Sequence, residues 1–246
     1  MLWGVLKKRL HCSKQTPTLP EGPFFSTPLS RFVMAVMSSR TTRSFGLNDV
    51  QIIDRVSLHD GFLKVARLTL RCRQFEGGWS REFTREVLLR GQGVGVLLYD
   101  SHLDKVLMVE QFRVGCMDDT ANGPWALELV AGLLEKGETP EDVARREVSE
   151  EAGITVGPLL RICEYYNSPG GSNEKLSIYC GAFDSTQAGG VFGIEDEAEN
   201  IRSVILDRTE AMAAIASGRI NNAMSIIALQ WLQLNLETVK GTLAQA

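Results

Sequence analysis

Residues Gly132–Ile154 read GLLEKGETPEDVARREVSEEAGI and predict one helix with clear ends. Thr139 suits the N-cap position, because its hydroxyl can accept a hydrogen bond from a free backbone N–H, and Pro140 suits the first helical position. Gly153 can adopt the left-handed conformation that ends many helices. The pattern therefore predicts a helix over residues 140–152.

Three carboxylates share one face of this helix. Glu147 lies three residues before Glu150 and four before Glu151, and both spacings bring side chains together on a helix surface. Like charges at this spacing destabilise a helix, and a bound divalent cation would remove the repulsion. Arg146 is the cation placed among them, and Glu138 can bind its guanidinium through both oxygens. An acidic helix face with ordinary surface ion pairs is the alternative.

The order of glycine and charged residues in this stretch resembles the Nudix box. From Gly132 the chain has five residues, Glu138, seven residues, Arg146-Glu147, an aliphatic residue, any residue, Glu150-Glu151, any residue, Gly153 and Ile154. Such a match arises by chance about once in a million chains of this composition. The resemblance implies a mixed α/β (α+β) fold, the Nudix α/β/α sandwich. It also implies hydrolysis of a nucleoside diphosphate linked to another group.

The resemblance further implies a metal site built from this box. The expected ligands are three carboxylates and one backbone carbonyl: Glu147, Glu151, Glu150 and Ala131. Arg146 and Glu138 would orient these groups from behind. Mg²⁺ is the expected cofactor, with Mn²⁺ as an alternative, because both favour oxygen ligands. The metal would neutralise phosphate oxygens and make a water nucleophilic.

A second glycine-rich stretch lies between two predicted strands. Residues Tyr165–Glu174 read YYNSPGGSNE, and Pro-Gly-Gly is a turn signal. In isolation this stretch could be a plain hairpin loop. However, Pro169 lies fifteen residues after Ile154, a placement that resembles the ADP-ribose pyrophosphatase branch of the family. By this resemblance Glu174 is the candidate general base, on a loop that swings in when substrate binds.

Three more residues match positions of the same branch. Arg113, at the end of the stretch VEQFR, would contact phosphate. Arg85 and Phe62 match positions that hold adenine, and in that family these come from the partner subunit of a domain-swapped dimer. A surface charge for Arg85 and a core position for Phe62 are the simpler alternatives. The stretch 223–234, AMSIIALQWLQL, also resembles bacterial members of the branch.

The expected reaction is therefore hydrolysis of ADP-ribose to AMP and ribose 5-phosphate by a homodimer. A Nudix hydrolase for another nucleoside diphosphate sugar, such as GDP-mannose or ADP-glucose, is the alternative enzyme. A non-catalytic protein that senses ADP-ribose is the alternative from another class. The complete set of box carboxylates favours an enzyme over a sensor.

Composition excludes several other classes. The net charge of -4 and the pI near 5.5 argue against a dedicated nucleic-acid binder. No apolar run approaches the roughly 20 residues that cross a bilayer. The five cysteines form no CxxC pair, so neither a disulfide framework nor a thiolate zinc site is expected, and a cytoplasmic location is the simplest. The three histidines lie in no site motif, which argues against a Ser-His-Asp triad.

The chain divides into three parts by composition. Residues 1–45 hold seven basic residues and one acid, and form a transit-like leader, a disordered tail or translation from an upstream start. Residues 46–94 form a β-rich region expected to serve dimerisation and substrate binding, and residues 95–240 form the Nudix hydrolase domain.

Alternating apolar residues and turn signals predict the remaining elements. Glu76–Gly78 suits a hairpin turn. Strands are expected at Val50–Val56, Phe62–Leu70, Glu82–Leu89, Gly95–Tyr99, Lys105–Phe112, Trp125–Val130, Leu159–Tyr166 and Leu176–Phe183. Two further helices are expected at Thr209–Ser217 and Asn221–Leu236. The acidic, glycine-rich segment Gly189–Asn200 is expected to be a loop with an indirect role, with a lid near the metals as the alternative.

Overall fold

A computed structural model of the protein describes residues 44–194 and 198–243. The leader expected over residues 1–45 therefore lies almost wholly outside the described residues, as do Glu195, Asp196 and Glu197 of the acidic segment. In the described parts of the chain, no helix has both the length and the apolar character needed to cross a membrane.

The structure contains two sheets and several helices. The strands are β1 Val50–Asp60, β2 Lys64–Cys72, β3 Phe83–Leu89, β4 Gln92–Asp100, β5 Lys105–Phe112, β6 Trp125–Glu128, β7 Val130–Leu133, β8 Leu159–Tyr166, β9 Lys175–Ala182, β10 Gly190–Phe192 and β11 Ile201–Asp207. The helices are α2 Pro140–Ala152, α3 Arg208–Ala216, α4 Ala223–Leu234 and α5 Leu236–Leu243, and η2 Leu47–Asp49 and η3 Val114–Cys116 are short 3₁₀ turns.

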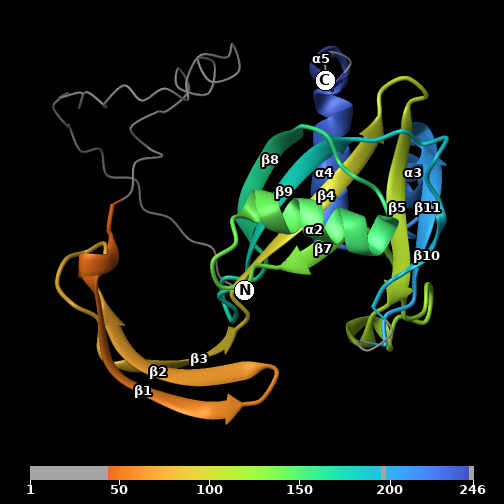
Figure 1. The fold of residues 1–246 in the computed structure, drawn as a ribbon. Helices are drawn as coiled ribbons and strands as arrows, with labels where there is room; N and C mark the ends of the chain where they lie inside the picture. The colour runs from red at the N-terminus through yellow and green to blue at the C-terminus, as the bar shows by residue number, and fades with distance from the viewer. Residues whose placement is uncertain (1–43, 195–197, 244–246) are drawn as a thin grey trace, which may run out of the picture. The chain divides into compact units, whose positions relative to one another are not determined.

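The larger sheet is mixed and is covered on both faces. Its eight strands follow the order β10-β11-β5-β4-β9-β8, with β6 paired to β5 and β7 paired to β4. Strands β4 and β9 run parallel, whereas β4 and β5 run antiparallel. Helix α2 crosses one face of the sheet and α4 lies on the other (Figure 1). This arrangement confirms the expected α/β/α sandwich.

Two apolar cores follow from the alternation of side chains along the central strands. Leu107 and Val109 of β5 are fully buried in the cluster beneath α2. Val106 and Met108 of the same strand are fully buried in the cluster beneath α3, α4 and α5. Each such side chain stabilises the fold by roughly 1.5–3 kcal/mol relative to an exposed one. The sheet therefore fixes α2 rigidly on one side.

Both ends of α2 lie where the sequence places them. At the start, the Thr139 hydroxyl accepts a hydrogen bond from the Asp142 N–H at 3.2 Å, and the Asp142 carboxylate accepts one from the Thr139 N–H at 2.9 Å. At the end, Gly153 has φ 66° and its N–H donates to the Ser149 carbonyl at 3.1 Å. A Cβ at Gly153 would lie 2.5 Å from the Phe192 ring of β10. Only glycine therefore fits both the turn and the packing.

The prediction of one strand over Trp125–Val130 is wrong in one respect. The structure has two strands there, β6 and β7, separated by Leu129. Residues before Leu129 pair with β5, and residues after it pair with β4. The Leu129 N–H donates to the Ser225 hydroxyl of α4 at 3.1 Å, which satisfies the backbone where the chain changes partner. A contact between residues so distant in sequence leaves no local signal.

The last expected helix, Asn221–Leu236, also differs from the structure. It ends at Leu234, because Asn235 leaves the helical conformation with φ -118° and ψ 17°. The Asn235 side chain donates to the Trp231 carbonyl at 2.8 Å, and α5 begins at the next residue.

The segment Gly189–Asn200 is not purely a loop, since it contains β10. Strand β10 pairs antiparallel with β11, which the sequence did not predict. The apolar run Val204–Leu206 was the available signal for β11, in which Arg202 and Ser203 separate this run from the buried Ile201.

The smaller sheet has the order β1-β2-β3. Strands β2 and β3 form an antiparallel pair, and Gly77 and Gly78 adopt φ 96° and 77° in their connection. The expected hairpin turn is thus confirmed, because such φ values are strained for other residues. Every residue of β1 is exposed.

Candidate active site

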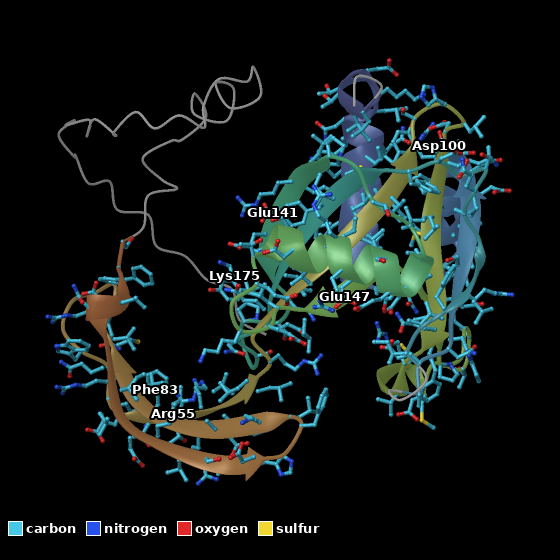
Figure 2. All side chains as sticks on the ribbon, in the orientation of Figure 1. Arg55, Phe83, Asp100, Glu141, Glu147 and Lys175 are labelled. Carbon is cyan, nitrogen blue, oxygen red and sulfur yellow. The ribbon has the colours of Figure 1, made fainter. Side chains whose placement is uncertain are left out.

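The carboxylate of Glu151 lies buried between α2 and the strands beneath it, and that of Glu147 is partly buried beside it. Glu151 is 4% exposed, and its Oε2 accepts a hydrogen bond from the Ala131 N–H at 3.0 Å. Glu147 projects from the side of α2 that faces β7 (Figure 2). A Cβ at Gly132 would lie 1.6 Å from Glu147 Oε1. The glycine that opens the box is therefore needed because the carboxylate occupies the space beside its backbone.

Arg146 joins three of the box carboxylates. Its Nε and Nη2 donate to the two oxygens of Glu138 at 3.0 and 3.3 Å, so the pair is bidentate. Its Nη1 donates to Glu147 at 2.7 Å and to Glu150 at 3.1 Å. The hydrogen bonds from Arg146 lower the pKa of Glu138. The carboxylates of Glu138 and Glu147 in turn raise the pKa of Arg146. The guanidinium thus holds the carboxylates in defined orientations.

Burial changes the proton affinity of the two inner carboxylates. Loss of solvent raises the pKa of Glu151 to about 8, with a smaller contribution from the charge of Glu147 and an opposing one from the Ala131 N–H. Loss of solvent also raises the pKa of Glu147, against the opposing effect of Arg146. Carboxylates held in this way gain from a cation beside them, because the cation stabilises their charged form.

The chemistry of the donor atoms fits a hard divalent cation. The side-chain atoms on this face of α2 that could bind a metal are all carboxylate oxygens. The missing side chain at Gly132 leaves room for those of Glu147. Within residues 44–194 and 198–243, no three His, Cys, Asp or Glu side chains already stand in a metal-ligand arrangement. Arg146 forms ion pairs with both Glu147 and Glu150 in this structure.

Arg113 lies next to this cluster. It follows β5 directly, and its Nε donates to Glu128 of β6 at 2.7 Å. Its positive charge lowers the pKa of Glu151. The Arg113 side chain is 41% exposed, so part of the guanidinium remains open to a ligand.

Glu199 influences the pKa of the box carboxylates from a part of the chain to which the sequence assigned only an indirect role. The hairpin of β10 and β11 packs on the end of α2, where Phe192 contacts Gly153. Glu199 lies just before β11, and its negative charge raises the pKa of both Glu147 and Glu151. The acidic residues of Gly189–Asn200 were the sequence signal for a role near the box. How near Glu199 lies to the box depends on the packing of the β10–β11 hairpin on α2, which the sequence does not show.

Glu174 lies in a different environment. The loop that carries it joins the antiparallel strands β8 and β9, so the expected hairpin is confirmed. Glu174 Oε1 accepts from Arg90 Nε at 3.2 Å, and Oε2 accepts from Asn167 Nδ2 at 2.7 Å. Glu174 is not among the principal charges that act on Glu151 in the described chain.

Phe62 and Arg85 belong to the smaller sheet. Phe62 is 89% exposed in the turn between β1 and β2, so the core alternative for this residue is wrong. Arg85 Nη1 donates to the Thr84 carbonyl at 2.8 Å, and its guanidinium lies 4.8 Å from the centre of the Phe83 ring. Their contacts are local, and their adenine-binding roles stay predictions.

Comparisons with known proteins agree with this site. The description "NUDIX domain" matches residues 89–222, which include the whole box, and the chain belongs to the Nudix family. A crystal structure described as an ADP compounds hydrolase has the same fold, with a TM-score of 0.59 at 18% identity over 79% of this chain and 98% of the other.

Curated relatives point to one branch of that family. An ADP-ribose pyrophosphatase of Escherichia coli is 44% identical over 197 residues, which are 80% of this chain and 94% of that protein. The ADP-ribose pyrophosphatase of Haemophilus influenzae is 41% identical, with 78% and 89% covered. A GDP-mannose pyrophosphatase of Klebsiella pneumoniae is 32% identical, with 75% and 92% covered.

Substitution Gly132→Ala is predicted to displace the Glu147 carboxylate and weaken divalent-cation binding. A loss of about 10- to 100-fold in affinity is expected, as for other changes that disturb the support of a metal ligand. Titration with Mn²⁺, followed by electron paramagnetic resonance, measures this. Gly115→Ala is the control, because a Cβ at that position meets nothing within 4 Å. Equal Mn²⁺ affinity in both variants would contradict the role of Gly132 in leaving space for the Glu147 carboxylate.

Proposed function

We propose that this protein hydrolyses ADP-ribose to AMP and ribose 5-phosphate. The observation that carries the proposal is that Arg113 lies beside the carboxylates of Glu147, Glu150 and the buried Glu151. Carboxylate oxygens suit a divalent cation, and a cation together with an arginine suits the pyrophosphate of a nucleotide. The relatives support ADP-ribose as the substrate, because the chain is 44% identical to an ADP-ribose pyrophosphatase and 32% identical to a GDP-mannose pyrophosphatase.

We propose Mg²⁺ as the cofactor, held by the side chains of Glu147, Glu150 and Glu151 and by the Ala131 carbonyl. When bound, the cation supplies charge neutralisation at the phosphates and lowers the pKa of a water. Arg146 keeps two of these carboxylates oriented through its contacts with Glu147 and Glu150. Arg113 binds a phosphate oxygen with the open part of its guanidinium.

Two carboxylates compete for the role of general base. The family resemblance favours Glu174, which would have to release both Arg90 and Asn167 to reach the box. The second candidate is Glu199, whose negative charge raises the pKa of both Glu147 and Glu151 and whose Oε2 accepts a hydrogen bond from the Ile194 N–H at 3.4 Å. We propose Glu199 as the carboxylate that orients the attacking water, with Glu174 as the alternative.

A panel of ADP-ribose, ADP-glucose, GDP-mannose and a nucleoside triphosphate, with Mg²⁺ and with or without EDTA, tests the reaction. ADP-ribose is expected to give the highest kcat/KM, and EDTA to abolish turnover. Glu147→Gln should lower kcat on the order of a thousandfold, because it removes a charged metal ligand.

The matched control is Glu141→Gln on the same helix, whose carboxylate is exposed and accepts a hydrogen bond from the Tyr179 hydroxyl at 3.0 Å. Preference for GDP-mannose would keep the chemistry and change the substrate. Full activity of Glu147→Gln would remove the metal assignment, and no turnover of any substrate would favour the sensor alternative.

Glu199→Gln and Glu174→Gln separate the two candidate bases. Loss of a general base costs about 10²- to 10⁴-fold in kcat, and this loss is expected for Glu199→Gln with KM nearly unchanged. Glu174→Gln is expected to keep kcat within about threefold. Steady-state kinetics with ADP-ribose gives both constants, and the opposite pattern would return the role to Glu174.

We also propose that the protein is a homodimer formed through its β-rich N-terminal region, residues 46–94. Ile52 and Ile53 of β1 are 61% and 48% exposed, and exposed apolar strands promote pairing with another chain. Light scattering after size exclusion is expected to give about twice the 27.1 kDa chain mass. A particle of one chain mass at micromolar concentration would refute the dimer.

A further inference from the structure

The edge of β6 that faces away from β5 is bound by side chains. Strand β6 pairs with β5 on one side, so the backbone groups on its other, outer edge need partners from elsewhere. Arg219 Nη1 donates to the Trp125 carbonyl at 3.0 Å, and Asn222 Nδ2 donates to the Leu127 carbonyl at 3.0 Å. Backbone groups of alternate residues point to the same edge of a strand, so both contacts lie on the outer edge of β6.

Helix α4 continues this row of contacts. The Ser225 hydroxyl accepts from the Leu129 N–H at 3.1 Å, and Ser225 is 0% exposed, so loss of the hydroxyl would leave a buried N–H without its partner. Asn222 Oδ1 accepts from the Ser225 N–H at 3.0 Å, so a single amide both caps α4 and holds β6. Helix α4 lies on the face of the sheet opposite α2 (Figure 1). The row therefore reaches β6 from the side that does not carry the box helix.

The strand held in this way leads directly into the candidate active site. Glu128, inside β6, accepts from Arg113 Nε at 2.7 Å. Ala131 lies two residues after Leu129, and its N–H donates to Glu151 Oε2 at 3.0 Å. The Ala131 carbonyl is also a proposed metal ligand. A shift of β6 would thus move a phosphate-binding arginine through its partner and a metal-binding carbonyl through the chain.

We infer that Asn222 and Ser225 are positioning residues, which hold the outer edge of β6 and so set the Ala131 carbonyl and the Glu128–Arg113 pair from the opposite face of the sheet. Both act through the backbone of β6. The effect on metal binding rests on the proposed function, whereas the mechanical link from α4 to Ala131 does not.

The substitution Asn222→Ser separates the hold on β6 from the cap of α4. Serine caps a helix about as well as asparagine, so the acceptor for the Ser225 N–H is kept. Its shorter side chain has no group at the position of Nδ2, so the bond to the Leu127 carbonyl is lost. Asn221→Ser is the matched control, because Asn221 Nδ2 donates to the Asp119 carboxylate at 3.0 Å in an exposed contact outside β6.

Hydrogen exchange of the full chain, without metal or substrate, tests the link. Asn222→Ser is expected to speed exchange of the Ala131 amide by at least about fivefold, because β6 and the start of β7 open together once the outer edge is released. Asn222 reaches β6 at Leu127, four residues earlier, so a purely local role would leave the Ala131 amide unchanged. Asn221→Ser is expected to leave it unchanged. An unchanged rate at Ala131 in Asn222→Ser would overturn the inference.

Titration with Mn²⁺, followed by electron paramagnetic resonance, tests the effect on the metal site. Asn222→Ser and Ser225→Ala are each expected to weaken Mn²⁺ binding by about three- to tenfold, because they act one step behind the groups that support the ligands. Leu232→Val, a change at a fully buried residue of the same helix, controls for a general loss of stability. It is expected to lower the melting temperature and leave Mn²⁺ affinity unchanged.

Equal Mn²⁺ affinities in Asn222→Ser, Ser225→Ala and Leu232→Val would overturn the positioning role. If the unaltered protein binds no Mn²⁺ and does not hydrolyse ADP-ribose, the proposed function fails, while exchange of the Ala131 amide still decides on the link.

Discussion

The close approach of α2 to β7 sets the position of the box carboxylates. This approach depends on Gly132, since any side chain there would overlap the carboxylate of Glu147. Because α2 also buries Val143 and Val148 against the sheet, its height above β7 is fixed by packing and cannot adjust to a larger residue. Glu151 is therefore presented to the sheet and not to bulk solvent, and Glu147 lies partly buried beside it.

This placement has an electrostatic consequence. Burial raises the pKa of Glu151 and of Glu147, and the opposing effect of Arg146 on Glu147 is smaller than the effect of burial. Ionising Glu147 and Glu151 together is therefore costly in the protein alone. An uncompensated charge of this kind is costly unless a further cation is bound, so the same packing that orders α2 also creates the demand for a metal.

The sequence predicted those features whose cause lies within a few residues. The bounds of α2 follow from Thr139, Pro140 and Gly153, and the box spacing alone placed its carboxylates on one face. Features that depend on distant partners were missed or misjudged. The break at Leu129 needs Ser225, and the contact of Glu174 with Arg90 joins residues 84 positions apart. No local pattern contains such pairs, so the bonds of Glu174 to Arg90 and Asn167 could not be predicted from its loop.

Gly153 shows how local and long-range constraints meet at one residue. Its left-handed conformation ends α2, which a sequence pattern can predict. The absence of a side chain also admits the Phe192 ring, and that contact docks the β10–β11 hairpin that carries Glu199 toward the box. The first glycine of the box therefore makes room for a carboxylate of the helix, and the last one makes room for the element that delivers another. Both positions act through the space they leave, so their importance for the charge cluster can be explained without any direct contact between a glycine and substrate.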